Sequence, residues 1–530
     1  MNSNVTVAAG VNGFRARLFS MLGLCFVLAM VALDQTVVGT ALPTVVAELH
    51  GFDLYAWVGT SYLLTSVITI PIFGRLGDEY GRKPFILVAI VLFTLASMLC
   101  GLAQTMLQLV LARALQGIGG GMLVATTFAS VPDLFPDAHE RLRWQVLFSS
   151  AFGLANAIGP SLGGFLTEYA GWRWVFYVNL PVGLLSLWFV WRFLPRIRHS
   201  DTPPGKLDWL GALLLALALG SVQLLVEWLP QHKSPGLLLL PGVCALVSIP
   251  LLLWWEKRCP HAILPLDMFR HASLAPLFAL SVVMGFCMFA IMYYAPLMYQ
   301  GGFGLSPNNA GLLITPFVVC ITVGSILNGR IVTRLPRPNV ILYAGFVFFA
   351  LSAIGLIQTG VQTPHWLIVL EMMSGGLGVG LLLPNLTIFA QETAPRTQLG
   401  IATAMLQSTR MIGGMMGMAL IGTFVSHHYA AGVAQLLQDA HAPQWTTALQ
   451  DPQILVNKQT AQAFIGAAGQ AALPLLEAAR LVLVQAIHSG QAVVLGMMLL
   501  ALYLVSRVPH IVLRRRSSTH TVKPLVEAVE

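Results

Sequence analysis

The chain has 530 residues, of which 56% are hydrophobic and only 9% are charged. Soluble domains carry roughly 25% charged residues, so this composition cannot supply the polar surface of a soluble protein of this length. Apolar stretches of about 20 residues, the length that crosses a bilayer as a helix, recur along the chain. The sequence therefore predicts an all-α membrane protein.

The predicted membrane spans number fourteen, and most of their connections are short. They cover residues 18–40, 55–74, 85–103, 107–129, 143–166, 174–192, 208–229, 236–255, 275–298, 309–330, 340–358, 365–388, 399–422 and 486–506. With both termini in the cytoplasm, most of the 29 Lys and Arg residues fall in inner segments, whereas the outer segments hold Arg173, Lys233, Lys458 and Arg480. Because Lys and Arg are favoured in cytoplasmic loops, this asymmetry predicts both termini inside. The net charge of +8 then reflects topology, and we expect no nucleic-acid partner.

The first predicted span carries an acidic residue, Asp34, in its outer half. A charge at bilayer depth costs roughly 2.5–3.5 kcal/mol on insertion scales, so Asp34 should face a cavity or a partner. Loss of water favours the protonated form of a carboxyl group, which would let Asp34 gain and lose a proton. The alternative is a structural aspartate bonded to backbone or hydroxyl groups.

The inner loop after the second span reads GRLGDEYGRKP, from Gly74 to Pro84. Glycines suit a tight turn, and the charges could lock two halves of a protein together. The chain resembles the major facilitator superfamily here, because the loop contains every element of that superfamily's signature. The resemblance implies a conformational gate made by Gly74, Arg75, Asp78, Gly81, Arg82 and Lys83. The alternative is an ordinary basic inner loop.

Two further spans strengthen this resemblance. Leu33 to Pro43 is similar to the first-span motif of the fourteen-span drug:proton antiporters, the EmrB/QacA type, and Leu111 to Gly119 is similar to the superfamily's second motif. The resemblance implies proton coupling by Asp34 and Arg113. Because an arginine cannot lose its proton in proteins, Arg113 would tune a carboxylate, and Asp34 is the natural partner. Pairing of Arg113 with backbone carbonyls is the alternative.

The fifth span resembles the antiporter motif of exporters within the superfamily. Gly159, Pro160, Gly163 and Gly164 are present, whereas the upstream glycine of the motif is replaced by Ala155. Glycines permit close helix approach, and a proline kinks a helix. The resemblance therefore implies export.

Internal repetition predicts two related halves, as in many transporters. Phe73–Leu76 matches Asn328–Ile331, and the glycines of Gly117–Gly121 match those of Gly376–Gly380, both at an offset of eight spans. We therefore expect a major facilitator fold of two six-helix bundles and two inserted spans. The predicted boundaries are 1–192 for the N-terminal bundle, 193–271 for the linker with the inserted spans, and 272–530 for the C-terminal bundle with a long outer loop at about 423–485. Within that loop, the run from Leu473 to Ile487 is either an external hairpin helix, which we favour, or an extension of the last span.

Several other residues are candidates for transport. Glu371 could be a second site of proton coupling, although a hydrated structural role near the outer end is nearly as good an explanation. Aromatic and thioether side chains suit bulky apolar cations, although packing or anchoring at the membrane interface is the commoner role. The substrate-cavity candidates are Trp57, Tyr62, Gln116, Met288, Met292, Tyr293, Tyr294 and Arg410.

The resemblance implies a multidrug efflux antiporter of the bacterial inner membrane that exports hydrophobic, cationic drugs or toxic compounds by alternating access. The proton gradient would supply the energy, with no cofactor, no metal and no enzymatic activity. Its partners would be drug-like molecules, protons and the lipid bilayer. A periplasmic adaptor and an outer-membrane channel are further possible partners. The alternative is an exporter of an organic acid, an amino acid or a siderophore on the same scaffold.

Overall fold

The structure is a computed structural model that describes residues 14–135, 138–196, 208–228, 235–259, 266–332, 335, 337–394, 399–469 and 472–509. These residues form helices and their connections, with no strand among them. The helices are α1 (Phe14–Leu49), η1 (Phe52–Leu54), α2 (Tyr55–Tyr80), α3 (Arg82–Leu102), α4 (Met106–Leu134), α5 (Ala138–Tyr169), α6 (Arg173–Tyr177), α7 (Asn179–Phe193), α8 (Trp209–Trp228), α9 (Pro235–Glu256), α10 (Leu266–Arg270), α11 (Ala275–Leu297), η2 (Met298–Gly302), α12 (Pro307–Ile331), α13 (Val340–Gln358), α14 (His365–Thr393), α15 (Leu399–Asp439), η5 (Pro443–Trp445), α16 (Thr446–Leu449), η6 (Pro452–Leu455), α17 (Lys458–Ala468) and α18 (Ala472–Val505). The predicted all-helical fold is confirmed.

Twelve helical stretches in the described part are long and apolar enough to cross a membrane. Each lies at a predicted span. The two remaining predicted spans, 143–166 and 399–422, fall within α5 and α15, which are not among the twelve. These helices are more polar, since α15 carries the run from Gln407 to Arg410. Both nevertheless pack inside the bundle, α5 against α1 and α12, and α15 against α2 and α11.

The two glycine clusters have equivalent surroundings, as their repetition predicts. A methyl group at Gly117 would meet the backbone of α2, whereas one at Gly119 would meet α3. In the same way, Gly376 faces the backbone of α12 and Gly378 faces α13. The absence of side chains thus lets α4 lie close to α2 and α3, and α14 close to α12 and α13. The predicted domain boundaries remain predictions.

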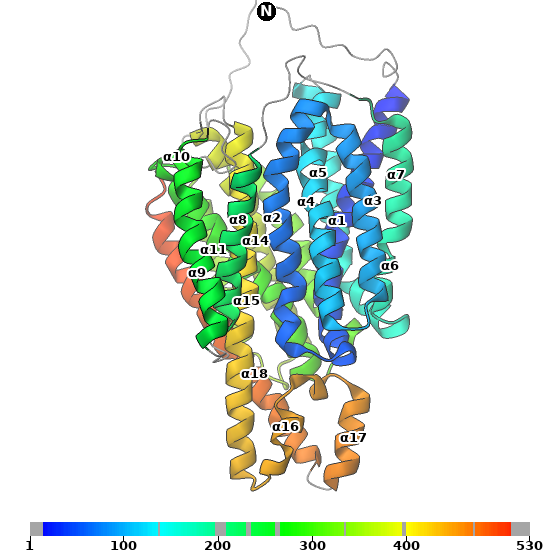
Figure 1. The fold of residues 1–530 in the computed structure, drawn as a ribbon, viewed down its shortest axis with the longest axis vertical. Coiled ribbons are helices and arrows are strands. Elements are labelled where there is room, and N and C mark those ends of the chain that lie inside the picture. The colour runs from blue at the N-terminus through cyan, green and yellow to red at the C-terminus, as the bar shows by residue number, and fades with distance from the viewer. Residues whose placement is uncertain are drawn as a thin grey trace, which may run out of the picture.

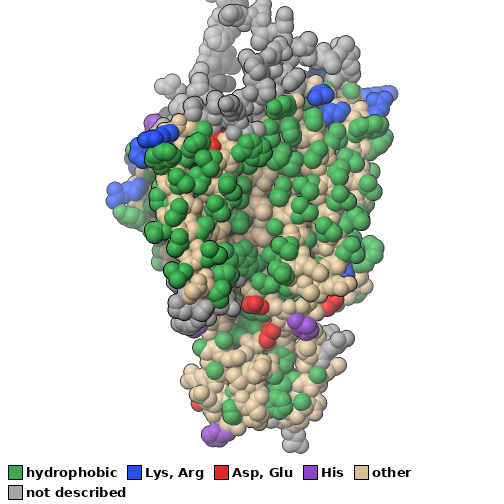
Figure 2. All heavy atoms as spheres, in the orientation of Figure 1, with side chains coloured by type: hydrophobic (Ala, Val, Ile, Leu, Met, Phe, Trp, Pro, Cys, Tyr) green, Lys and Arg blue, Asp and Glu red, His purple; other side chains and the backbone are tan. Residues whose placement is uncertain are grey.

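Helices from the two parts of the chain also pack on one another. The contacts join α5 to α12, α2 to α15 and α1 to α11. The inserted helices α8 and α9 pack together, and α8 contacts α2 and α15. In Figure 1 the helices run roughly parallel, and a smaller segment with α16 and α17 extends beyond one end. Figure 2 shows most of the visible Lys and Arg side chains at the opposite end.

The segment between α15 and α18 corrects one prediction. The favoured external hairpin helix at Leu473 to Ile487 is wrong, because this run belongs to one continuous helix, α18. The polar residues that suggested an interruption are accommodated: Glu477 is exposed, and His488 Nε2 lies 3.0 Å from the Thr359 carbonyl oxygen. The last predicted span is therefore the second half of a longer helix.

Candidate functional site

A buried ion pair joins the middle of α1 to α4. Arg113 Nη1 donates to Asp34 Oδ2 at 2.6 Å, and each residue is 1% exposed. The predicted pairing of these two residues is therefore present. A buried pair is stable only if further hydrogen bonds satisfy both charges.

Polar side chains on α4 and α7 supply these hydrogen bonds, and Ser97 on α3 binds both of them. Gln116 Nε2 donates to Asp34 Oδ1 at 2.7 Å and to Ser97 Oγ at 2.6 Å. Asn179 Nδ2, at the start of α7, also reaches Asp34 Oδ1, at 3.2 Å, and Ser97 Oγ, at 2.9 Å. We call Asp34, Arg113, Gln116, Ser97 and Asn179 the polar network. All five are buried, and the donors around the carboxylate stabilise its charge.

Sequence reasoning found only part of this network. Gln116 was predicted to line the substrate cavity, but it is bonded to Asp34 because it lies one turn after Arg113 on the same face of α4. Ser97 and Asn179 were missed. The signal that could have found both is that each is a polar residue inside an otherwise apolar predicted span.

The guanidinium of Arg113 also makes contacts outside the network. Its Nε donates to the Val58 carbonyl oxygen at 3.2 Å, and its Cζ lies 4.5 Å from the centre of the Tyr62 ring. Tyr293 of α11 also interacts electrostatically with Arg113. The ion pair of α1 and α4 therefore interacts with α11, in the C-terminal part of the chain.

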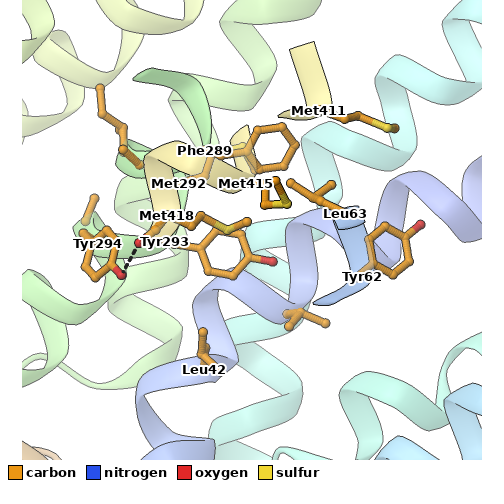
Figure 3. Packing of buried hydrophobic residues seen from close by; sticks show 14 of the residues in the cluster. Leu42, Tyr62, Leu63, Phe289, Met292, Tyr293, Tyr294, Met411, Met415 and Met418 are labelled. Atoms are coloured by element: carbon orange, nitrogen blue, oxygen red, sulfur yellow. Dashed lines mark hydrogen bonds between the residues drawn. The ribbon is translucent and has the colours of Figure 1, made fainter. Parts of the chain in front are cut away.

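Tyrosines and methionines fill the space between α2, α11 and α15 (Figure 3). We call this set the Met–Tyr cluster: Tyr62, Met292, Tyr293, Tyr294, Met411, Met415 and Met418. The Tyr294 hydroxyl donates to the Met418 carbonyl oxygen at 2.8 Å, and the Tyr55 hydroxyl donates to the Tyr293 carbonyl oxygen at 2.7 Å. Every member of the cluster is buried.

Most residues predicted to line the substrate cavity therefore lie together in the packed core. Tyr62, Met292, Tyr293 and Tyr294 belong to the Met–Tyr cluster. Trp57 and Met288 are half-buried and pack against the same core. In this conformation these side chains pack together in one cluster of the core.

Glu371 and Arg410 lie in other surroundings. Glu371 Oε2 accepts from Thr359 Oγ1 at 2.6 Å, at the end of α13. Arg410 is partly buried and donates to Gln407 on its own helix. The described contacts of neither residue include Asp34, so the structure does not bring the three predicted coupling residues together.

The loop between α2 and α3 is a tight turn, as predicted. Gly81 has a φ of +89°, a left-handed conformation that favours glycine. Lys83 Nζ donates to the Trp191 carbonyl oxygen at 2.9 Å, near the end of α7. A methyl group on Gly74 would meet no neighbour, and the Arg82 side chain packs near Gly77. The side chains of Arg75 and Asp78 lie outside the described residues.

The glycines of α5 allow it to lie between α1 and α12. A methyl group at Gly159 would fall 1.8 Å from Thr36 Oγ1, and one at Gly163 would fall 2.6 Å from the Val37 carbonyl oxygen. Gly164 faces the other way, where a methyl group would lie 2.3 Å from the Pro307 carbonyl oxygen. Side chains at these positions would push the helices apart. The carbonyl oxygen of Pro160 lies close to Gly311 of α12.

Comparison with known families decides what kind of protein carries this arrangement. Residues 24–418 match the Major Facilitator Superfamily model. The chain belongs to the Major Facilitator Superfamily. It is thus a multi-pass transporter.

Named relatives of this facilitator include drug transporters. Multidrug transporter protein MdtP of Bacillus subtilis is 33% identical over 431 residues, which cover 79% of this chain and 77% of that protein. Multidrug resistance protein 3 of the same species is 33% identical over 415 residues, 76% of this chain and 79% of that protein. Multidrug resistance protein Stp of Mycobacterium tuberculosis is 29% identical over 428 residues, 80% of this chain and 79% of that protein.

Solved structures of facilitators share the fold. A bacterial homologue of the human lysosomal transporter Spinster, in an inward-facing and unoccupied conformation, superposes with a TM-score of 0.65 at 14% identity over 94% of this chain and 99% of that chain. A D-xylose–proton symporter gives a TM-score of 0.55 at 16% identity over 84% of this chain and 98% of that chain. At such identities the likeness shows the fold alone.

Proposed function

We propose that this facilitator exports hydrophobic cationic compounds across the cytoplasmic membrane in exchange for protons. The observation that carries the proposal is the buried pair of Asp34 and Arg113 within the bundle. A charged pair is costly at bilayer depth, and such residues commonly mark ion or proton pathways. The names of the relatives support drugs as the substrate class.

Proton uptake at Asp34 would change the balance of the polar network. A neutral Asp34 no longer attracts Arg113, and a buried guanidinium without a counter-charge is strongly destabilised. Arg113 would then favour a conformation in which water or the Gln116 side chain compensates its charge. Proton release would restore the pair shown by the structure.

Tyr293 offers a direct route from this change to the interface between the two parts of the chain. It interacts with Arg113, and its backbone carbonyl accepts from Tyr55 of α2. A shift of Arg113 would therefore disturb the packing between α2 and α11. Separation of the Met–Tyr cluster would expose thioether and aromatic faces, which suit bulky apolar cations.

Alternating access would require breaking polar contacts at the end of α1 that we place outside. Thr44 Oγ1 donates to Gln300 Oε1 at 3.0 Å, and Gln300 Nε2 donates to the Thr40 carbonyl oxygen at 2.7 Å. Nearby, Asn457 Nδ2 donates to the Ala47 carbonyl oxygen at 2.8 Å. These bonds hold α1 against η2 and the segment after η6, so the structure is closed at this end.

We also propose that α5 and α15 cross the membrane, which gives fourteen spans and places both termini in the cytoplasm. Their packing against helices that are among the twelve apolar stretches supports this topology. The inserted helices α8 and α9 would then lie between two six-helix bundles with the predicted boundaries. Glu371 would serve as a second protonation site near the outer end.

The test is transport in inverted membrane vesicles. Because the cytoplasmic face of these vesicles is outside, efflux by the protein is measured as accumulation of ethidium in the lumen. Asp34→Asn should reduce this proton-driven transport to the rate of vesicles that lack the protein, while the amount of inserted protein is unchanged. Asp53→Asn is the matched control, because Asp53 is an exposed acid in η1 and should leave efflux intact. Undiminished efflux in Asp34→Asn would remove Asp34 from the coupling role.

Arg410 favours a second candidate function, the export of an organic acid, amino acid or siderophore. Its described hydrogen bond goes to Gln407 and not to a carboxylate, so its charge could attract an anion. A growth assay of an efflux-deficient host against toxic cations and anions separates the two. Protection against cations alone supports drug export, and protection that is lost in Arg410→Gln only for anions supports the rival.

A further inference from the structure

An apolar groove lies between α3 and α7 on the outer surface of the bundle. The two helices contact each other, and both lie near the right edge of Figure 1. The cavity measures about 790 Å³ and is lined by leucine, valine and tryptophan side chains. Several of these are largely exposed, including Leu95 of α3 at 53%, and Leu184 and Trp188 of α7 at 65% and 53%. In a membrane this groove faces lipid.

Basic side chains lie at one end of the groove. Trp191 lines it, and the Trp191 carbonyl oxygen accepts from Lys83 Nζ at 2.9 Å. The next residue, Arg192, is in the last turn of α7 and is exposed. An ammonium group has three donors, so Lys83 can bind a further acceptor while it keeps the contact with Trp191.

We propose that this groove binds an anionic phospholipid, with an acyl chain along the apolar walls and the phosphate at Lys83 and Arg192. The apolar walls with a cationic end complement an amphipathic anion. Basic pockets between membrane helices on the cytoplasmic side bind anionic headgroups, and our topology places this end there. The same charges repel the hydrophobic cations that we propose as exported substrates.

Bound lipid would act on a part of the transporter that changes conformation. Lys83 lies in the first turn of α3, directly after the tight turn at Gly81 that follows α2. Helix α2 carries Tyr62, which contacts Arg113. A phosphate at Lys83 would thus fix α3 to α7 at the inner end. The lipid site rests on the proposed topology but not on the proposed export substrate, so failure of the lipid test would leave the export proposal intact.

The first test is lipid binding by the purified full-length chain in detergent, followed by native mass spectrometry. Phosphatidylglycerol and phosphatidylcholine with the same acyl chains are compared. Each basic residue near a membrane surface contributes about 1 kcal/mol to the binding of acidic lipid, or about fivefold in affinity. Lys83→Gln with Arg192→Gln should therefore weaken phosphatidylglycerol binding about 25-fold and leave phosphatidylcholine binding unchanged.

Arg507→Gln is the matched control, because it removes an exposed cation after α18 that hydrogen-bonds Tyr503 rather than lining the groove. It should bind both lipids as the wild type does. Equal wild-type affinity for the two lipids, or a preference for phosphatidylglycerol that survives the double substitution, would overturn the proposal. If the double variant does not fold, Lys83→Gln is compared with Lys83→Arg, which keeps the positive charge. Only Lys83→Gln should weaken phosphatidylglycerol binding.

A second variant tests the apolar part of the site. Leu184→Trp should fill the groove and weaken binding of both lipids, whereas Leu499→Trp, at an exposed position of α18, should not. Unchanged phosphatidylglycerol binding in Leu184→Trp would show that the lipid binds elsewhere.

Discussion

The carboxylate of Asp34 accepts hydrogen bonds from three side chains on two helices. Arg113 and Gln116 lie on α4, and Asn179 begins α7. Hydrogen bonds to the charged form of an acid favour that form. The network therefore holds the charged carboxylate of Asp34 in place, and each donor contributes to its stability.

Asn179→Ala removes one donor without changing a charge. The carboxylate of Asp34 loses one hydrogen bond, so the buried pair is held less firmly and the rate of proton-driven ethidium export should fall. The rate is measured in inverted vesicles as accumulation of ethidium in the lumen. Asn156→Ala is the control, because Asn156 donates to the Phe152 carbonyl oxygen and not to the network. An export rate that is unchanged in Asn179→Ala, or lowered equally by both substitutions, would contradict the role of the network.

At the scale of the helix, α5 is held by glycines on two of its faces. Gly159 and Gly163 face α1, and Gly164 faces α12. Because α1 carries Asp34 and α12 belongs to the C-terminal part of the chain, α5 connects the proposed proton site to the C-terminal part. The resemblance associates this motif with export. The structure shows that its glycines pack α5 against α1 and α12.

Gly163→Val tests this packing. Its side chain would collide with the Val37 backbone, and overpacking typically costs about 1–3 kcal/mol, so the melting temperature in detergent should fall and efflux should be lost. Gly496→Val is the control, because a methyl group at Gly496 of α18 meets no neighbour. Equal melting temperatures for the two variants would show that α5 does not need a glycine at this contact.

At the scale of the whole molecule, the polar contacts of Thr40 and Thr44 with Gln300 close one end of the bundle. The segment beyond this end adds a hydrogen bond, in which His50 Nδ1 lies 2.9 Å from Gln453 Oε1. Burial raises the pKa of the nearby Asp451 carboxyl. A group with a raised pKa stabilises the folded arrangement most at low pH and less as the pH rises through that pKa. The folded segment that holds Gln453 should therefore be most stable in acid.

A reversible cross-link tests whether this closed end must open. In a variant whose six cysteines are replaced by alanine or serine, Thr44→Cys and Gln300→Cys are joined by a short cleavable bifunctional reagent. Efflux should stop on cross-linking and return when the link is cleaved, because alternating access needs the two parts to separate there. Efflux that continues through the cross-linked protein would mean that these contacts persist throughout transport.

Much of this organisation could be predicted from the sequence. Apolar length located the helices, and Asp34 and Arg113 were paired because few charges lie within the spans. The network around them could not be predicted, because the sequence shows that Ser97 and Asn179 are polar but not which neighbour each helix face meets. For the same reason, Met292 and Tyr293 were predicted to line a cavity, whereas the structure packs them against α2 and α15. The continuous α18 was missed because the partner of His488, the Thr359 carbonyl, lies far away in the sequence.

The most direct test of the account measures protons released when substrate binds. Purified protein in detergent and weak buffer, with a pH-indicating dye, is mixed with ethidium at a pH where efflux is active. We predict that the wild type releases protons on addition of the cation and that Asp34→Asn releases none, although it still binds ethidium. Proton release of the same size from Asp34→Asn would contradict the account.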